Sequence, residues 1–459
     1  MTVELPKLAA SHSSPAEDAS GLSAAPKASR YPWYVLTLLL TVYSFNWMDR
    51  YVLVILLEQI KRDLRLSDTA LGFLSGFAFA AIYSLAGIPI ARWADRASRR
   101  SVIAGGLALW SVMTAASALA LNFLQLAAAR FGVALGESAC SPPASSLISD
   151  YFPAHRRATA FAIYGVGISI GMGLGLFIGG WAGEAYGWRA AFSIVGLPGL
   201  LLALVVRFTL REPQRGQVES HAVADARPYS VRDTARIILS RKSFLAYAVG
   251  LGLFSFSGIS FEIWTPVYLM RAYHMGTGAV GALTGFVEAV GGIIGTMGGG
   301  LLADRLGMRD VRWYLWLPAA AATLLVLSML VFLHTSQTVM FVFYFVTIVC
   351  SATYMAPMVA ITQRIMPVHM RAQGTAILYL LLNLIGPGAG PLVAGILNDS
   401  LEGRYGGEAV RISLTITLLG AVCGIVLVMY AARRLIADLT LASLPERVSQ
   451  TGAPLVEVQ

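Results

Sequence analysis

Charged residues are scarce in this chain. They make up only 13% of its 459 residues, whereas 56% are hydrophobic. A typical soluble domain carries about 25% charged residues, which keep its surface hydrated. The mean hydropathy of +0.67 points in the same direction. So large an apolar excess cannot be hidden in one aqueous core, and the composition therefore predicts that lipid is the main solvent.

Cysteine is also rare, and the motifs of several enzyme classes are missing. Cys140, Cys350 and Cys423 fall within apolar runs and share no metal-ligand spacing, so we expect packing residues and no metal. There is no Walker lysine motif, which argues against ATP-driven transport, and no His-Glu-x-x-His. The sequence therefore predicts no cofactor and no enzyme, and an intramembrane enzyme or a membrane sensor is kept as the alternative class.

Long apolar runs dominate what the sequence does contain. A helix needs about 20 apolar residues to cross a bilayer, and lipid-exposed backbone must satisfy its own hydrogen bonds. These runs lack the alternating polarity of barrel strands. They predict an all-α membrane protein with twelve transmembrane helices at 32–57, 69–93, 101–121, 124–148, 158–182, 190–209, 244–269, 278–302, 312–333, 338–363, 372–397 and 410–432.

The distribution of lysine and arginine predicts the orientation. With a cytoplasmic N-terminus, cytoplasmic segments hold 25 of the 34 basic residues, external loops hold seven, and two lie inside spans. This asymmetry follows the positive-inside rule. We therefore expect a multi-pass protein of a plasma (bacterial-type inner) membrane with both termini in the cytoplasm. The same asymmetry explains the net charge of +9 without a nucleic-acid partner.

An internal repeat divides the chain into two halves. Ala91–Arg100 follows the second span and Gly300–Arg309 follows the eighth, and each contains an Asp-Arg pair 209 residues from the other. Repeats of this kind indicate a duplicated bundle. The predicted organisation is a disordered cytoplasmic tail at 1–30, a six-helix bundle at 31–210, a cytoplasmic linker at 211–243, a second six-helix bundle at 244–434 and a cytoplasmic tail at 435–459.

These repeated loops resemble the hallmark G-x-L-A-D-R-x-G-R-R loop of the major facilitator superfamily. Residues 300–309 match it well, and residues 91–100 match it with Ala91 and Ser98 at the two glycine positions. The resemblance covers roughly residues 32–434. It implies two pseudo-symmetric six-helix bundles that work by alternating access.

Within that superfamily the chain resembles the spinster group. The resemblance is carried by Asn46-Trp-Met-Asp49-Arg50 in the first span and by Arg130-Phe-Gly-Val-Ala-Leu-Gly136-Glu137-Ser138 in the fourth. It implies transport of lysolipids or sphingosine-type lipids, in several cases with a proton gradient. No spacing in the sequence itself points to a lipid.

Four charged residues lie well inside the predicted spans of the first half, away from the span ends, namely Asp49, Arg50, Arg130 and Glu137. A charge in a span costs at least about 2.5 kcal/mol, so such residues are candidates for function. Asp49 and Arg130 lie at similar depths, and we expect them to pair. Arg130 and Glu137 are seven residues apart and face the same way.

These residues suggest a proton relay. We expect Asp49, Arg130 and Glu137 to couple proton movement to opening of the bundle, because burial favours the neutral form of a carboxyl group. Arg50 is a candidate for binding an anionic head group. The alternative is a permanent salt-bridge network that fixes helix packing.

The second half lacks this set, because an offset of 209 residues maps Asp49, Arg130 and Glu137 onto uncharged positions. Its own intramembrane carboxylates are Glu262 and Glu288, which we take as candidates for substrate binding or as polar residues satisfied at a bundle interface. The full set of predicted substrate-binding residues is Arg50, Glu137, Glu262, Glu288, Phe45 and Trp264. The charge asymmetry predicts that the first half handles protons and the second offers apolar surface.

The repeated loops and the glycines are assigned to gating and packing. The predicted gating residues are Asp95, Arg96, Arg99, Arg100, Asp304 and Arg305, with solvated loop charges as the alternative. Glycines crowd the fifth and eighth spans, where small residues let helix backbones approach closely. We interpret them as a pivot between the halves, with simple tight packing as the alternative. Gly386–Pro391 should kink or soften the eleventh span.

The expected function is therefore secondary active transport by alternating access, with proton coupling, of an amphipathic lipid-like substrate or an organic anion. A proton-independent facilitator and an exporter of drugs or organic anions are the alternatives. The expected partners are the substrate, protons and membrane lipids, and the expected state is a monomer.

Overall fold

The computed structural model describes residues 30–94, 96–213, 241–366 and 370–443, and this described part is helical with no strands. The first half contains α1 (Tyr31–Leu64), α2 (Asp68–Gly72), η1 (Phe73–Phe77), α3 (Ala78–Ala94), α4 (Arg99–Ser117), α5 (Phe123–Glu137), α6 (Ser141–Tyr151) and α7 (Ala154–Thr209). The second half contains α9 (Lys242–Ala272), α10 (Thr277–Gly307), α11 (Trp313–His334), α12 (Gln337–Ala352), α13 (Met355–Ile365), α14 (Arg371–Asn383), η3 (Leu384–Ala389), α15 (Gly390–Tyr405), η4 (Gly406–Glu408) and α16 (Ala409–Ser443).

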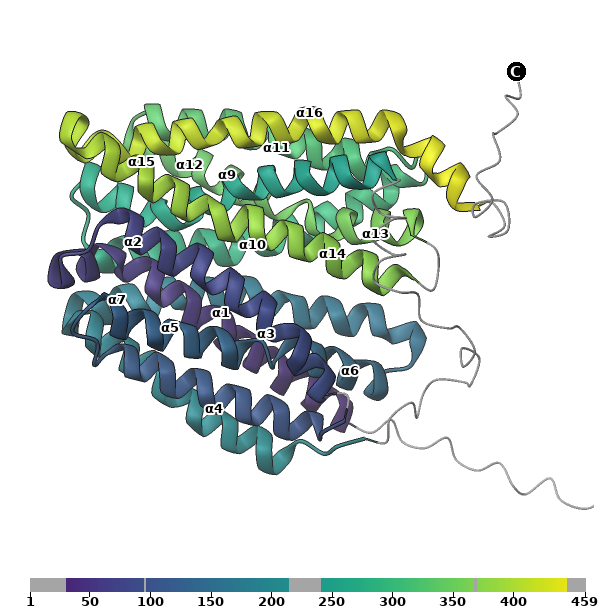
Figure 1. Ribbon diagram of the computed structural model, residues 1–459, viewed down its shortest axis with the longest axis horizontal. Coiled ribbons are helices and arrows are strands. Elements are labelled where there is room, and N and C mark those ends of the chain that lie inside the picture. Colours follow the sequence, from purple (N-terminus) through teal and green to yellow (C-terminus); the bar gives the residue numbers. More distant parts are fainter. Residues whose placement is uncertain (1–29, 95, 214–240, 367–369, 444–459) are drawn as a thin grey trace, which may run out of the picture.

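These helices form two bundles that lie side by side with their axes roughly parallel (Figure 1). Seven continuous helical stretches of the described chain are long and apolar enough to cross a membrane, and the stretches His155–Thr209 and Gln373–Thr440 are each long enough for two crossings. The predicted all-α fold is confirmed. The interior of the predicted linker and both predicted tails fall largely outside the described residues.

Two predicted spans are broken in the structure. The fourth divides into α5 and α6, and α5 ends at Glu137. The break falls just before Pro142 and Pro143, which lack the N–H groups that would continue the helical hydrogen bonds. The tenth span divides in the same way into α12 and α13, so the break recurs in both halves. Its recurrence supports the duplication inferred from the sequence.

The fifth and sixth spans lie within α7 and are separated at Gly187. This residue has a φ of 82°, a conformation that glycine adopts without strain. The first segment of α7 then packs along α10 of the other half. Neither helix has room for side chains where they cross: a Cβ on Gly173 would lie 2.7 Å from the carbonyl oxygen of Gly285. The expected close packing of these glycine-rich spans is thus present, and it joins the two halves.

Gly281→Ala should lower the stability of the protein, because its methyl group would be forced against the carbonyl oxygen of Leu176 on α7. Overpacking of this kind costs about 1–3 kcal/mol. Gly298→Ala on the same helix is the matched control, since nothing lies within 4 Å of its Cβ position. Thermal unfolding in neutral detergent should show a lower Tm for Gly281→Ala and an unchanged or higher Tm for Gly298→Ala. Equal Tm values would refute the close crossing.

Another contact between the halves is made by two π-helical segments. η1 in the first half packs against η3 in the second, and a Cβ on Gly76 would lie 2.8 Å from the carbonyl oxygen of Pro387. η3 covers most of the Gly-Pro segment at which the sequence predicted a softened helix. The π turn at η1 has no such signal in the sequence. Segments of this type are frequent at functional sites, and both lie beside the cavity described below.

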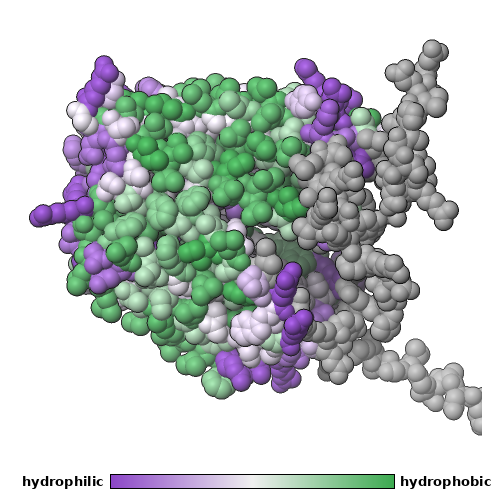
Figure 2. Space-filling view, in the orientation of Figure 1, coloured by the Kyte–Doolittle hydropathy of each residue, from purple (hydrophilic) through white to green (hydrophobic). Residues whose placement is uncertain are grey.

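The two ends of the molecule differ. We name the end that carries the α1–α2 turn the closed end, because polar side chains link the halves there. The opposite end, which carries the α3–α4 and α10–α11 turns, is the open end. No ion pair or hydrogen bond between described residues links the halves at this end. Figure 2 shows apolar residues over most of one face and a hollow between the halves toward the open end.

Candidate functional site

A central cavity with a volume of about 100 Å³ lies between the halves. Ten of the fourteen lining residues come from α1, η1, α3 and α5 of the first half, and four come from α9, α14 and η3 of the second. The lining residues are Trp47, Arg50, Tyr51, Leu53, Val54, Ser75, Phe79, Ala80, Tyr83, Arg130, Ile259, Ile263, Asn383 and Pro387. The only formal charges among them are the two arginines, so the cavity combines positive charge with an apolar and aromatic wall.

Arg50 is held in a fixed position by aromatic rings and by one carboxylate. Its guanidinium carbon lies 4.6, 4.4 and 4.9 Å from the ring centroids of Trp47, Phe79 and Tyr83. Its Nε donates to Glu137 Oε2 at 2.6 Å, and Glu137 is fully buried. Cation–π contacts and a charge-assisted hydrogen bond therefore orient this arginine at the cavity wall.

The expected ion pair between Asp49 and Arg130 is not formed. Arg130 Nη1 donates to the backbone carbonyl oxygen of Asp49 at 3.2 Å, and the Asp49 carboxylate instead accepts from the hydroxyl of Thr114 at 3.2 Å. The carboxylate that does pair, Glu137, takes Arg50 as its partner. The physical reason is rotation: adjacent residues on a helix point about 100° apart, so Asp49 faces α4 while Arg50 faces the cavity.

The hydrogen bonding of this group is incomplete. Asp49 Oδ1, Glu137 Oε1, Arg130 Nε and Asn46 Nδ2 are buried and have no hydrogen-bond partner within the described chain. Buried polar atoms are normally paired. We name Asp49, Arg50, Arg130 and Glu137 the first-half charge cluster. It contains two acids and two bases, and only one ion pair forms among them.

Glu262 and Glu288 of the second half are buried carboxylates that do not line the cavity. Glu262 accepts hydrogen bonds from Tyr51 at 3.0 Å and Ser351 at 3.2 Å, and Glu288 accepts one from Tyr344 at 3.2 Å. Glu262 and Glu288 are 7% and 2% exposed. Neither forms an ion pair with a described residue. The predicted substrate-binding residues Glu262 and Glu288 thus lie behind the wall, with Ile259 and Ile263 forming the wall itself.

Two aromatic residues predicted to bind substrate also lie outside the cavity lining. Trp264 is fully buried, and its indole N–H donates to the carbonyl oxygen of Pro391 at 3.1 Å, which joins α9 to α15. Phe45 is partly buried and packs against the apolar core. Helix rotation decides which aromatic residues reach the cavity. The aromatic residues that line the cavity beside Arg50 are Trp47, Phe79 and Tyr83.

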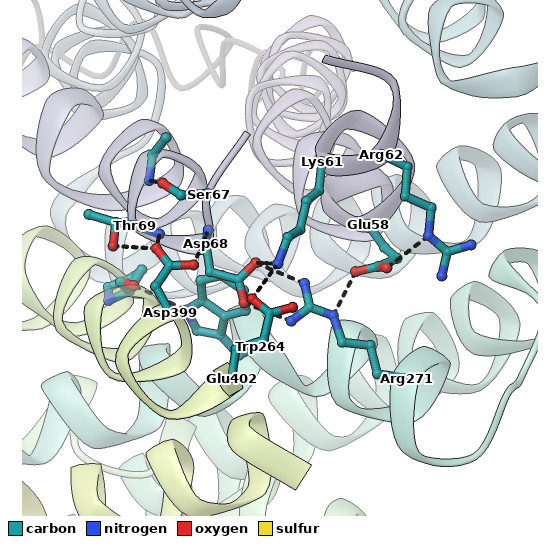
Figure 3. A network of polar contacts seen from close by, with 12 residues as sticks. Glu58, Lys61, Arg62, Ser67, Asp68, Thr69, Trp264, Arg271, Asp399 and Glu402 are labelled. Carbon is teal, nitrogen blue, oxygen red and sulfur yellow. Dashed lines mark hydrogen bonds and ion pairs between the residues drawn. The ribbon is translucent and has the colours of Figure 1, made fainter. Parts of the chain in front are cut away.

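A network at the closed end joins the halves and was missed by the sequence analysis (Figure 3). Arg271 at the end of α9 donates to both oxygens of Asp68, at 2.7 and 2.8 Å, and to Glu58 at 2.8 Å. Lys61 lies 2.9 Å from Asp68, which is fully buried. The only sign of this network in the sequence is a set of charged residues at the ends of spans in both halves. Pairing them requires the docking of the halves.

Asp399 makes a second set of contacts in the same network (Figure 3). Its carboxylate accepts from the backbone N–H of Asp68 at 2.9 Å and of Thr69 at 2.8 Å. These N–H groups belong to the start of α2, where a helix leaves its first donors free and favours negative charge. The carboxylate of α15 in the second half therefore serves as a cap for a helix of the first half.

The residues predicted to gate lie at the open end, and their described contacts stay within one half. Arg99 is buried and donates to Asp150 at 2.5 Å and to Glu212 at 2.8 Å, which ties α4 to α6 and to the segment after α7. Asp304 accepts from Tyr314 at 3.2 Å. Arg96 and Arg305 are exposed, and Arg100 is partly exposed. Asp95 falls outside the described residues.

Glu212, at the same end, accepts hydrogen bonds from three consecutive residues. Burial works against its charged form, but hydrogen bonds from the Arg100 backbone, Arg99 and Ser98 outweigh it and hold the pKa of Glu212 below its usual value. The carboxylate therefore stabilises the fold above the ordinary pKa of glutamate, and this contribution is lost as the pH falls through the lowered pKa.

Two helical halves around a central charged cavity that is closed at one end are typical of a membrane transporter. The model of the Major Facilitator Superfamily matches residues 39–384. The chain belongs to the major facilitator superfamily, and it resembles the spinster proteins.

Individual relatives place the chain more closely. It is 34% identical to an "MFS-type efflux pump" of Mycolicibacterium smegmatis, over 86% of this chain and 92% of that protein. It is 24% identical to "Protein spinster homolog 1" of Xenopus laevis, over 80% and 73% of the two chains. A solved bacterial homolog of the human lysosomal transporter spinster, in an inward-facing and unoccupied conformation, has a TM-score of 0.79 and 27% identity over 89% of this chain and 98% of that one.

Proposed function

We propose that this protein is a proton-coupled secondary transporter that moves an amphipathic anion by alternating access. The observation that carries the proposal is the cavity wall, where Arg50 and Arg130 are the only formal charges and the remaining lining is mostly apolar or aromatic. An anionic head group fits the two guanidinium groups, and an apolar tail fits the surfaces formed by residues such as Ile259 and Ile263. The resemblance to spinster proteins supports a lipid-like substrate.

The open end is assigned to the cytoplasm of a bacterial-type inner membrane. The repeated basic loops lie at this end, and basic loops remain on the cytoplasmic side of membrane helices. With this assignment both termini are cytoplasmic, and the described conformation faces inward. The likeness to an inward-facing solved structure supports this assignment.

The first-half charge cluster is proposed to be the proton relay. A permanent packing network would satisfy its members, yet Asp49, Arg130 and Glu137 each keep a buried polar atom without a partner. Unpaired buried groups are costly, and a proton or a new partner relieves that cost. Protonation of Glu137 would release Arg50, which already lines the cavity and can then bind the anion.

The repeated loops are proposed to gate the open end. In the inward-facing state Arg96 and Arg305 lie exposed, and the contacts that Asp304 and Arg99 make with described residues stay within their own halves. When the open end closes, these charges become available to the opposite half. We also propose a gating role for Arg100 and Asp95, because they belong to the repeated loop at residues 91–100.

Binding by Arg50 provides the test of the proposed substrate class. Lysophosphatidylglycerol should raise the Tm of the purified protein in neutral detergent, whereas dodecyltrimethylammonium, a cationic amphiphile, and D-glucarate, an anion without a tail, should not. Arg50→Gln should weaken the affinity for lysophosphatidylglycerol about tenfold or more, because a hydrogen bond to a charged group contributes about 1.5–3 kcal/mol.

Arg92→Gln is the matched control, because Arg92 is exposed at the open end. Stabilisation by the cationic amphiphile alone would overturn the anionic assignment, and stabilisation by glucarate alone would overturn the requirement for a tail.

The similarity to an efflux pump favours export as the direction of transport. Substrate flux that does not respond to a pH step would instead identify a proton-independent facilitator. We propose that the transporter works as a monomer.

A further inference from the structure

One hydrogen bond between the halves lies apart from all the others. The remaining hydrogen bonds and ion pairs between described residues of the two halves lie at the closed end and involve residues 58–69, 184, 271–278 and 399–402. The exception joins Tyr51 of α1 to Glu262 of α9 at 3.0 Å. Tyr51 precedes Gln59 by eight residues, which places the bond about 12 Å deeper along α1. It is therefore a direct polar link between the halves at the depth of the cavity.

Glu262 depends on this link because no base offsets its charge. The titratable groups that face it are Tyr51 from α1, Glu288 from α10, Tyr344 from α12 and Tyr354 from the turn between α12 and α13. No lysine, arginine or histidine in the described chain pairs with Glu262 or Glu288. Without Tyr51, the Glu262 carboxylate would keep the Ser351 hydroxyl as its hydrogen-bond donor and would still face a second carboxylate.

On its other side, Tyr51 reaches the first-half charge cluster. Its ring lines the cavity and lies 6.3 Å from the ring of Trp47. Trp47 in turn lies under the Arg50 guanidinium at 4.6 Å, and Arg50 pairs with Glu137. A displacement of α1 relative to α9 thus acts on Glu262 and on the environment of Arg50 at the same time.

We propose that Glu262 is a second-half protonation site whose state is controlled across the interface by Tyr51. In the inward-facing state Tyr51 donates to Glu262 and supports its carboxylate. When the halves separate at the closed end, Tyr51 withdraws, and Glu262 takes a proton from the water that enters. This inference rests on the proposed proton coupling, and it assigns the second half a share in a process that the sequence placed in the first half alone.

The chain offers a matched pair of tyrosines for the test. Tyr51→Phe removes the Tyr–Glu hydrogen bond that crosses the interface, whereas Tyr344→Phe removes the equivalent bond to Glu288 within the second half. Spin labels at Leu121→Cys and Ser336→Cys, in exposed positions of the two halves at the closed end, report the opening as a distance distribution. The background carries Cys423→Ser, because Cys140 and Cys350 are buried.

The pH at which the closed end is half open should shift by about one unit or more in Tyr51→Phe and Glu262→Gln. Tyr344→Phe should leave this midpoint unchanged. If Tyr51→Phe misfolds, Glu262→Gln still tests the same hydrogen bond from its other side. The size-exclusion profiles of all variants must match that of the wild type. A wild-type midpoint in both Tyr51→Phe and Glu262→Gln, or an equal shift in Tyr344→Phe, overturns the inference.

Failure of the underlying proton coupling gives a different result. If the wild-type distance distribution does not respond to pH, or if Asp49→Asn and Glu137→Gln respond as the wild type does, the first-half relay is refuted. If Asp49→Asn and Glu137→Gln alter the pH response of the distance distribution but Tyr51→Phe and Glu262→Gln do not, only the role of Glu262 is refuted.

Discussion

Glu137→Gln is expected to reduce pH-driven uptake of lysophosphatidylglycerol into proteoliposomes by tenfold or more. The glutamine cannot carry the charge that Glu137 presents to Arg50 at 2.6 Å, and it cannot release a proton. Removing one partner of a buried pair costs about 3–5 kcal/mol, and a tenfold change corresponds to about 1.4 kcal/mol. The expected loss therefore lies well within what this contact can supply.

Asp438→Asn is the control for this substitution. Asp438 is also buried, and its carboxylate accepts from the backbone N–H of Ser243 in the second half, away from the cavity. Its loss should affect stability but leave the uptake per folded molecule near the wild-type value. Equal losses of uptake in the two variants would show that any buried carboxylate is needed for folding and would remove Glu137 from the mechanism.

Arg271→Gln is expected to open the closed end. Arg271 neutralises Asp68 and Glu58 at once, and Asp68 is fully buried, so the substitution leaves two carboxylates with reduced compensation. The free energy involved, about 3–5 kcal/mol, is enough to shift the balance between inward- and outward-facing states by more than a hundredfold. The distance distribution between labels at residues 121 and 336 should broaden toward longer values.

Arg411→Gln is the matched control at the same end. Arg411 pairs with Glu408 on its own side of the interface, and both side chains are substantially exposed. Exposed pairs contribute about 0–1 kcal/mol, so the distance distribution should match that of the wild type. An unchanged distribution in Arg271→Gln as well would mean that the glycine contacts of α7 and α10, rather than the charged network, hold this end closed.

The fold could be predicted because apolar run length and backbone chemistry leave few solutions in lipid. The duplication was also visible, since the Asp-Arg turns recur at a fixed spacing. The breaks after Glu137 and near Thr353 were missed, because an apolar run continues across them. Pro142 and Pro143 were the available signal for the first break.

The site was predicted in part. Asp49, Arg50, Arg130 and Glu137 were found because charge in a span is costly, and the structure gathers all four beside the cavity. Their pairing was wrong, since it depends on a rotation of about 100° between adjacent residues. The network of Arg271 and Asp68 could not be paired from the sequence, because the two residues approach only when the halves dock.

The proposed role of Glu262 differs from the division of labour between the halves that the sequence predicts. The sequence shows two carboxylates in the second half but does not show that Tyr51 of the first half binds one of them. A contact between residues 211 positions apart depends on the register of α1 against α9. Periodicity within either helix carries no information on that register.

The most direct test of the account is proton movement during transport by the Asp49→Asn, Glu137→Gln double variant. Proteoliposomes containing a pH-sensitive dye would be given lysophosphatidylglycerol with no imposed pH gradient. The wild-type protein should move protons in fixed proportion to the lysolipid, and any residual lysolipid flux in the double variant should occur without protons. The same ratio of protons to lysolipid in both proteins would contradict the relay.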